Sequence, residues 1–283
     1  MRTIKKPDIL FEDEHILVCF KPSGVPVQTR SASTPDMESI LKNHLMRSAA
    51  RAGASGAPSA SRGSRRPPYL AVIHRLDQPV EGLLVFAKTP EAAAGLNSQL
   101  QSDSFGKYYK AIVCGRLPKA SGRLTDYLVK DGRTNMSRIC AKDTPGARYA
   151  ELSYEILRAV AFPETAARTA LSSARMSTDA QTPTPAQMSA DAQTPTTPRT
   201  SSAECTLVRI TLRTGRHHQI RVQMAAAGAP LLGDAKYNPV AVQNGTQLAL
   251  CAYRLCFSHP VTGKQMEFEL DDRQILGGRI SDM

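Results

Sequence analysis

Short apolar runs of strand length, separated by polar turns, open the chain. Residues 9–11 and 16–20 flank the acidic turn 12–14, and the Lys-Pro-Ser-Gly stretch 21–24 ends the second run. Two such runs on either side of a tight turn predict a β-hairpin. A further apolar run, residues 82–88, is followed by Thr-Pro-Glu as an N-cap, a first-turn proline and a first-turn acid. That order predicts a strand that leads into a helix.

Strand-like alternation continues through the rest of the chain. Five further runs contain β-favouring side chains in partial alternation: residues 107–114, 147–157, 207–213, 248–257 and 266–270. The last two runs predict a closing hairpin. The second and third runs flank an insertion, and without that insertion they would form an ordinary long hairpin.

One later segment has helical periodicity instead. Ile220, Met224 and Ala227 recur at i, i+4 and i+7, and Gly228 follows them. This spacing predicts a short amphipathic helix over residues 218–227 that stops at the glycine. Since strands outnumber helices and hairpins dominate, we expect an α+β fold, a mixed, largely antiparallel sheet with flanking helices.

Two segments have an amino-acid composition that does not form a packed core. Residues 47–68 consist of Arg, Ser, Ala, Gly and Pro, with five Arg and no acidic residue, which is typical of a flexible basic loop. Residues 163–205 are rich in Thr, Ser, Ala, Pro and Gln and contain two imperfect copies of a twelve-residue repeat. Two copies without an apolar face are too few for a solenoid, so we expect a disordered, low-complexity insertion. We interpret residues 1–283 as a single domain that carries these two segments.

Charge narrows the class of partner. The 283 residues include 36 Lys and Arg against 25 Asp and Glu, a formal net charge of +11. Basic residues remain in excess outside the two segments, which predicts a polyanionic partner for the folded part. No apolar run approaches the ~18 residues of a bilayer span, and the N-terminal stretch lacks the apolar core of a secretory signal. We therefore expect a soluble, cytoplasmic protein without a membrane partner, whose six Cys are free thiols.

The first cluster of residues that could carry chemistry lies just before the apolar run 82–88. His74, Arg75 and Asp77 occupy a turn-like segment there, and rigid scaffolds present reactive groups on such loops. Local turn and ion-pair roles for Arg75 and Asp77 explain the same pattern, and they are the simpler interpretation of the spacing alone.

A second cluster stands at the start of the predicted helix. Arg216, His217, His218 and Arg221 gather where free N–H groups and the helix dipole favour an anion, and an RNA phosphate would suit this position. The two adjacent His raise the alternative of a metal-dependent hydrolase. Neighbours at i, i+1 point to different sides of a helix, however, and no Cys or carboxylate stands at ligand spacing, so we expect no metal.

The third cluster alternates cations with aromatic rings. On a strand, Lys107 and Tyr109 would share one face, and Tyr108 and Lys110 the other. Such a face can stack on a base while its Lys meets a phosphate. A core Tyr flanked by solvated Lys is an equally good interpretation of these residues alone.

In this order, the three clusters closely resemble the RluA-like family of pseudouridine synthases, which isomerise uridine to pseudouridine within RNA. The resemblance covers nearly the whole chain apart from the two segments described above. The motifs that carry it are ILFEDEHILV (9–18), KPSGVPV (21–27), HRLD (74–77), K-x-Y-x-A-x-V-x-G (107–115), residues 214–237, residues 248–263 and Phe268.

This resemblance implies a role for each of four residues. Asp77 would be the catalytic aspartate, Tyr109 the ring that packs on the target base, and Arg221 the basic partner of the aspartate. Arg75 would lie on the RNA side and help to hold the target nucleotide out of the helix. The implied substrate is a specific uridine in structured ribosomal or transfer RNA, and the reaction requires no cofactor or metal.

Three further residues are candidates for contact with the RNA backbone: Lys107, Arg216 and His218. We expect a monomer, since no exposed apolar stretch is evident. The chain starts at the first motif of the catalytic domain, so we expect no N-terminal RNA-binding module.

The chain departs from the family pattern at several positions. Val80-Glu81 replaces the usual Thr-Ser after HRLD, and a carboxylate facing the site would disturb Asp77 and repel phosphate, whereas one facing away would not. His217 replaces a Thr and Gln223 a His, and both changes affect substrate contacts more than chemistry. The alternative function is a catalytically inactive RNA-binding protein on the same fold.

Overall fold

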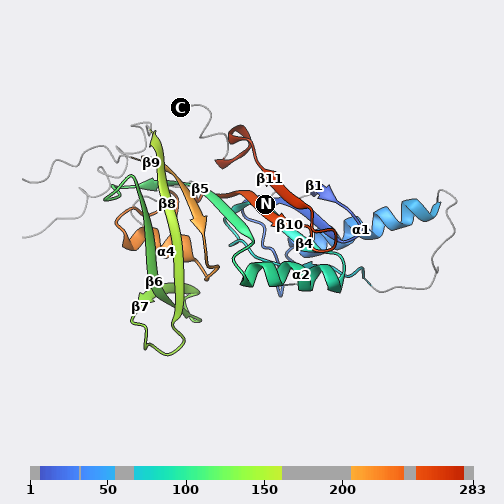
Figure 1. The fold of residues 1–283 in the computed structure, drawn as a ribbon, viewed down its shortest axis with the longest axis horizontal. Coiled ribbons are helices and arrows are strands. Elements are labelled where there is room, and N and C mark those ends of the chain that lie inside the picture. Colours follow the sequence, from blue (N-terminus) through green and yellow to red (C-terminus); the bar gives the residue numbers. More distant parts are fainter. Residues whose placement is uncertain (1–6, 32, 55–66, 161–204, 239–246, 277–283) are drawn as a thin grey trace, which may run out of the picture.

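The computed structural model describes residues 7–31, 33–54, 67–160, 205–238 and 247–276 (Figure 1). The helices in these ranges are α1 (Met37–Ala54), α2 (Pro90–Gln101), α4 (Gln219–Ala226) and the short 3-10 turn η2 (Asp272–Gln274). The strands are β1 (Asp8–Glu12), β2 (Ile16–Lys21), β3 (Ala71–Val72), β4 (Glu81–Ala87), β5 (Gly106–Cys114), β6 (Ser121–Asp131), β7 (Met136–Cys140), β8 (Arg148–Val160), β9 (Cys205–Leu212), β10 (Leu250–Ser258) and β11 (Gln265–Glu269).

Within the described ranges, these strands form one 11-stranded sheet. Their order is β1-β2-β4-β10-β5-β9-β8-β6-β7, with β11 paired to β10 and β3 to β4. Only β4 and β10 among the described strands pair in parallel; the other pairs are antiparallel. The α+β fold with a mixed, largely antiparallel sheet is therefore confirmed, as is the pairing of β8 with β9 across the insertion.

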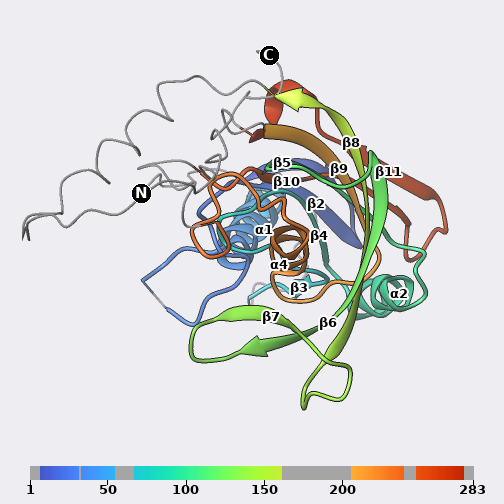
Figure 2. The same cartoon turned by 90° about the vertical axis from the view of Figure 1, so that its left-hand side faces the viewer.

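Apolar side chains cover both faces of the sheet. On β2, Leu17 belongs to one buried cluster and Val18 to the other, as the alternation of a strand requires. The first cluster includes α1 and α4, and the second includes α2. Figure 2 shows the sheet curving around α1 and α4, with α2 on its outer side. Strand β4 lies between the two layers, and six of its seven residues are buried.

The local signals for α2 and for the end of α4 act as predicted. The Thr89 side chain accepts the N–H of Ala92 at 3.2 Å, and Pro90 occupies the first helical position. Gly228, with φ of 80°, follows the end of α4 and donates its N–H to the carbonyl of Ala225. A left-handed residue at this place is the usual stop for a helix.

The prediction of a flexible basic loop at residues 47–68 was partly wrong, because residues 47–54 belong to α1. Met37 and Leu41 are fully buried, and the Asp36 carboxylate accepts the N–H of Ser39 at 2.8 Å. The apolar spacing at the start of the helix and the helix-favouring Ala residues that follow explain why it continues into the Arg-rich segment. Residues 55–66 lie outside the described residues. So does the predicted insertion, except for its last residue, Cys205, which begins β9.

The hairpin of β6 and β7 was not predicted. The first residues of β6 alternate between exposed and half-buried, but Leu128 is its one buried residue, so the apolar pattern in the sequence is weak. The helix expected to be amphipathic, α4, is buried on both sides. It packs against this hairpin as well as against the sheet, and Arg221 and Gln223 are buried along with Ile220.

Candidate active site

Asp77 lies in the loop between β3 and β4, and this loop is held from beneath by the turn that follows β2. The buried Lys21 ammonium donates to the carbonyls of Pro22, Val25 and Gln78 at 3.1, 2.7 and 3.0 Å. Ser23 Oγ donates to the carbonyl of Pro79 at 2.7 Å. Burial lowers the pKa of Lys21 to about 8, against the opposing charges of Asp77 and Glu81. The Lys-Pro-Ser-Gly turn therefore fixes the segment that presents Asp77.

Gly82 sets the position of this loop on its other side. Residues Glu81 and Gly82 pair in parallel with Cys251 and Ala252 of β10. Gly82 has φ of 129°, and a Cβ there would overlap the backbone of Ala252. Only glycine allows the two strands to approach so closely at the point where the loop enters β4.

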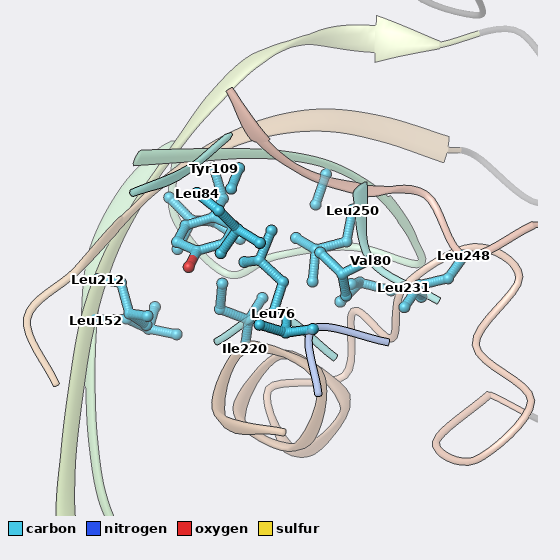
Figure 3. Packing of buried hydrophobic residues seen from close by; sticks show 14 of the residues in the cluster. Leu76, Val80, Leu84, Tyr109, Leu152, Leu212, Ile220, Leu231, Leu248 and Leu250 are labelled. Atoms are coloured by element: carbon cyan, nitrogen blue, oxygen red, sulfur yellow. The ribbon is translucent and has the colours of Figure 1, made fainter. Parts of the chain in front are cut away.

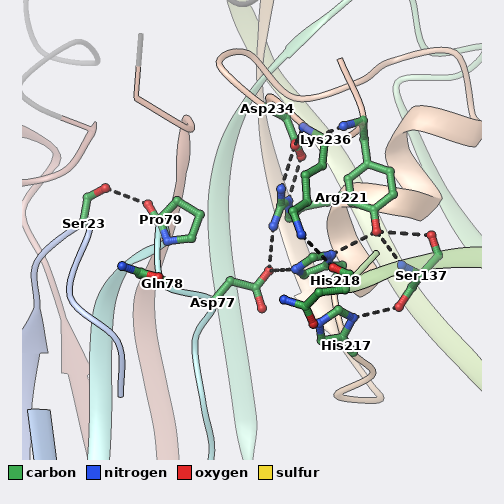
Figure 4. A network of polar contacts seen from close by, with 12 residues as sticks. Ser23, Asp77, Gln78, Pro79, Ser137, His217, His218, Arg221, Asp234 and Lys236 are labelled. Atoms are coloured by element: carbon green, nitrogen blue, oxygen red, sulfur yellow. Dashed lines mark hydrogen bonds and ion pairs between the residues drawn. The ribbon is translucent and has the colours of Figure 1, made fainter. Parts of the chain in front are cut away.

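Asp77 forms an ion pair with Arg221 of α4. Arg221 Nη1 lies 3.1 Å from Asp77 Oδ2, and the Asp77 side chain is 26% exposed. The same guanidinium donates from Nε and Nη2 to the two oxygens of Asp234 at 2.8 and 2.7 Å, where the Asp234 side chain is fully buried (Figure 4). One arginine therefore links a buried carboxylate to a partly exposed one.

The charge state of this buried pair follows from its contacts. Burial alone would raise the pKa of Asp234, but the hydrogen bonds and charge of Arg221 outweigh burial and hold that pKa below its ordinary value. Burial likewise opposes the charge of Arg221, and the two carboxylates raise its pKa in spite of it. The guanidinium therefore stays charged beside Asp77 and aims its carboxylate through a charge-assisted hydrogen bond.

Strand β5 contributes Tyr109 and Lys107 from one face. The Tyr109 ring is buried against Leu84, Ile210 and other apolar side chains of the sheet (Figure 3). On the opposite face, the Lys110 ammonium lies 4.5 Å from the centre of the Tyr253 ring. The predicted division of this cluster into two faces is confirmed. Burial raises the pKa of Tyr109, so its hydroxyl stays protonated.

His217 and His218 precede α4 and stack on each other rather than pointing apart. Their ring centres are 3.8 Å apart, and His218 has φ of 54°. His218 Nδ1 lies 2.9 Å from the Tyr237 hydroxyl, and His218 Nε2 lies 3.6 Å from Asp77 Oδ2. His217 Nδ1 lies 2.9 Å from Ser137 Oγ. Expected to face the RNA backbone, His218 is instead buried, with both ring nitrogens directed at protein groups.

These groups surround a cavity of about 1210 Å³. That volume exceeds the roughly 300–1,000 Å³ of pockets for small molecules, which leaves room for a nucleotide with its neighbours. All seven residues that were assigned a catalytic, substrate-binding or RNA-backbone role line the cavity: Arg75, Asp77, Lys107, Tyr109, Arg216, His218 and Arg221. Arg75 is exposed, and Arg216 is half-buried, with its Nε donating to the carbonyl of Tyr149 at 2.8 Å.

The structure shows where the residues that depart from the family pattern lie relative to the cavity. The Glu81 carboxylate accepts the N–H of Leu276 near the end of the described chain, and Glu81 does not line the cavity. Gln223 also lies outside the lining, and its amide donates to Asp126 Oδ2 of β6 at 2.6 Å. Gln223 therefore ties α4 to the β6–β7 hairpin and makes no contact with the cavity. His217 does line it.

Sequence reasoning missed three residues of this site: Asp234, Tyr237 and Ser137. Asp234 and Tyr237 lie in a motif that was recognised, but no role was given to them. The Asp directly after the apolar Leu231-Leu232-Gly233 stretch was the available signal, since buried carboxylates are paired. Ser137 lies in the unpredicted β7 and carried no signal.

The described residues contain neither a metal-binding cluster nor a membrane-spanning helix. In the described part of the chain, no group of three or more His, Cys, Asp or Glu is arranged to hold a metal ion. No helix within the same residues is long and apolar enough to cross a membrane.

Comparisons with known proteins agree with the geometry. Residues 15–226 match the family model described as RNA pseudouridylate synthase. The chain is 30% identical over 280 residues to ribosomal large subunit pseudouridine synthase D of Zymomonas mobilis, covering 95% of this chain and 71% of the relative. It is 29% identical over 263 residues to the dual-specificity RNA pseudouridine synthase RluA of Haemophilus influenzae, covering 92% and 91%.

A solved structure shows the same fold. Human RNA pseudouridylate synthase domain containing 1 superposes with a TM-score of 0.65 at 16% identity, covering 98% of this chain and 88% of that one. The family match spans most of the sequence, and its residues supply the loop, the strand and the helix that meet at the cavity. The chain belongs to the RluA-like family of RNA pseudouridine synthases, which are intramolecular isomerases.

Proposed function

We propose that this chain converts a specific uridine in ribosomal or transfer RNA to pseudouridine, with Asp77 as the catalytic residue. The observation that carries the proposal is the Asp77–Arg221 pair, at 3.1 Å, on the wall of a cavity that also contains Tyr109. A partly exposed carboxylate held by a buried cation is a group that can react with a bound sugar without moving.

The reaction needs only a positioned nucleophile or base. The N1–C1′ bond of uridine breaks, and a C5–C1′ bond forms. The proton at C5 leaves while N1 ends with a proton, so atoms and electrons balance within the nucleotide. Asp77 acts on the sugar–base unit as nucleophile or base, and the surrounding cavity keeps the detached uracil in place for the second bond.

Tyr109 supplies the surface for the base. Its ring lies at the end of an apolar layer formed with Leu76, Val80 and Leu250, and it faces the cavity (Figure 3). A uracil turned out of its helix is stabilised by stacking on such a ring, which offsets the few kcal/mol that extrusion costs.

Arg75, Lys107 and Arg216 serve the RNA backbone and the vacated position in the helix. Arg75 is exposed at the mouth of the cavity beside Asp77, where it replaces the extruded nucleotide. Lys107 and Arg216 approach the cavity from β5 and from the segment before α4. Cations at these places neutralise phosphates, so binding weakens as salt rises.

The names of two relatives indicate which class of RNA to test as the substrate. One relative is named for the large ribosomal subunit and the other for dual specificity. We therefore take ribosomal RNA as the first substrate to test and transfer RNA as the second.

The experiment is tritium release from 5-tritiated uridine in total ribosomal and total transfer RNA. Asp77→Asn keeps the size of the side chain and removes its charge, so we expect no release while RNA affinity stays within about threefold. Carbodiimide-dependent stops of reverse transcription, in cells with and without the gene, then identify the position. Release by Asp77→Asn at the wild-type rate would refute the proposal. Tight RNA binding without release by the wild-type protein would favour the inactive RNA-binding alternative.

A further inference from the structure

We propose that His218 is a positioning residue for Asp77. A hydrogen bond from the Tyr237 hydroxyl to Nδ1 of the His218 ring aims the Nε2–H of that ring at Asp77 Oδ2. This inference rests on the proposed role of Asp77. It replaces the expected contact between His218 and the RNA backbone.

The geometry leaves the His218 ring two partners. Nδ1 lies 2.9 Å from the Tyr237 hydroxyl and Nε2 3.6 Å from Asp77 Oδ2, and the residue is 7% exposed (Figure 4). Burial lowers the pKa of His218 to about 4, and the charge of Asp77 opposes this only in part. The ring is therefore neutral at pH 7 and carries one proton, so that its tautomer decides what faces Asp77.

Electrostatics selects the tautomer. A bare Nε2 would direct its lone pair at the Asp77 carboxylate, whereas Nε2–H directs a donor at it. Nδ1 must then accept a hydrogen bond from the Tyr237 hydroxyl. The Tyr237 oxygen already accepts the N–H of Ser137 at 2.7 Å, and its own proton has two acceptors within reach, His218 Nδ1 at 2.9 Å and the Ser137 carbonyl at 3.2 Å. The shorter contact is the one that the Nε2–H tautomer requires.

The ring is also held mechanically. His218 adopts a left-handed backbone, which is uncommon for a residue other than glycine and persists only when its surroundings enforce it. His217 stacks on one side at 3.8 Å, and the Tyr237 ring meets it edge-on at 5.6 Å. His217 and Tyr237 both bind Ser137, so the β6–β7 hairpin anchors the whole arrangement.

Both donors approach the same oxygen of Asp77. Arg221 Nη1 at 3.1 Å and His218 Nε2 at 3.6 Å face Oδ2, which makes Oδ2 the anchored oxygen. The carboxylate then presents Oδ1 to the substrate. Arg221 fixes one direction by its hydrogen bond, and the attraction of the His218 donor, 3.6 Å from the same oxygen, opposes rotation of the carboxylate about that contact.

Two variants test the donor because their side-chain amides differ in reach. In His218→Gln, the side-chain amide nitrogen reaches the place of Nε2 and still donates. In His218→Asn, the amide reaches only the place of Nδ1, although Asn tolerates the left-handed backbone better. We expect His218→Asn to lower kcat for pseudouridine formation on the order of 10²-fold with KM within about twofold, and His218→Gln to restore most of the loss. Equal kcat values for the two variants would overturn the proposal.

A second measurement does not depend on activity. Long-range ¹H–¹⁵N spectra of the wild-type protein labelled in its His rings report the tautomer directly, and His218→Gln identifies the signal. The expected result at pH 7 is the neutral Nε2–H form; an Nδ1–H or charged ring overturns the proposal. Failure of the proposed function would show instead as tritium release by Asp77→Asn at the wild-type rate, so the two failures are distinguishable.

Discussion

Removal of the Arg221 guanidinium leaves the Asp234 carboxylate unpaired in the protein interior. The Asp234 side chain is fully buried, and the Arg221 side chain is 5% exposed. Loss of one partner from such a pair costs about 3–5 kcal/mol, because the other charge stays buried without compensation. The backbone N–H groups of Lys236 and Tyr237 still donate to Asp234 Oδ1 at 3.0 and 3.2 Å. We therefore expect Arg221→Met to lower the free energy of unfolding by about 3 kcal/mol, the lower end of that range.

The loss has a defined dependence on pH. In the wild-type protein the pKa of Asp234 is lowered, so the carboxylate contributes stability above its unfolded pKa that disappears as the pH falls. In Arg221→Met, burial acts without the cation and raises the pKa of Asp234 above its unfolded value. The carboxyl then takes up a proton as the pH falls, which relieves the unpaired charge. The difference in stability between the two proteins should shrink between pH 7 and pH 4.

Urea unfolding followed by circular dichroism at pH 7 and pH 4.5 measures both effects. A loss of about 3 kcal/mol corresponds to a fall of roughly 6–12 °C in Tm for a chain of this size. The second change Asp234→Asn should recover most of the loss, because it removes the stranded charge. Arg209→Met is the matched control: its ion pair with Glu155 is exposed, and it should cost at most about 1 kcal/mol. A loss below 1 kcal/mol in Arg221→Met, or one equal at both pH values, would refute this reasoning.

Three further predictions concern the strand, the base and the RNA. Gly82→Ala should lower the free energy of unfolding in urea by about 3 kcal/mol, because the added Cβ meets the β10 backbone. The control Gly132→Ala should cost far less, because a Cβ there meets nothing within 4 Å. Equal losses would contradict the close approach of β4 and β10. Tyr109→Phe should keep kcat/KM near wild type while Tyr109→Leu lowers it by roughly 5–150-fold, the equivalent of about 1–3 kcal/mol of stacking; similar values for both would exclude stacking. Replacement of the three Arg in residues 62–66 by Ser should flatten the slope of log affinity against log salt by about 2, at about 0.7 for each phosphate contact on single-stranded RNA, and an unchanged slope would exclude contact.

Elements governed by local signals could be predicted from the sequence. The N-cap Thr89 and Gly228 bound their helices as expected, and alternation located most strands of the sheet. The helix α1 and the β6–β7 hairpin could not be predicted in the same way. Arg-rich composition concealed the end of α1, and β6 buries only Leu128, so neither pattern distinguishes these elements from a loop.

The residues of the candidate site likewise fall into those that could be predicted from the sequence and those that could not. Family motifs located Asp77, Tyr109 and Arg221, and all three line the cavity. The partner of Arg221 inside the protein, Asp234, lies 13 residues further along the chain, and the hydroxyl next to His218, from Tyr237, lies 19 residues further along. Such contacts are set by packing in three dimensions, which the spacing of residues along the sequence does not encode.

The position of Asp77 is determined by groups that do not react. Lys21 holds the carbonyl of Gln78, which follows Asp77 directly, and Gly82 fixes the point where the same loop becomes β4. Arg221 reaches the carboxylate only because Asp234 holds its other edge in the interior. Each contact comes from a different segment, so an error in any one would move the carboxylate relative to Tyr109. Because a displacement of 1 Å can cost about 10²-fold in rate, we expect changes at the buried Lys21 and Asp234 to lower the proposed activity of Asp77 as well as the stability of the fold.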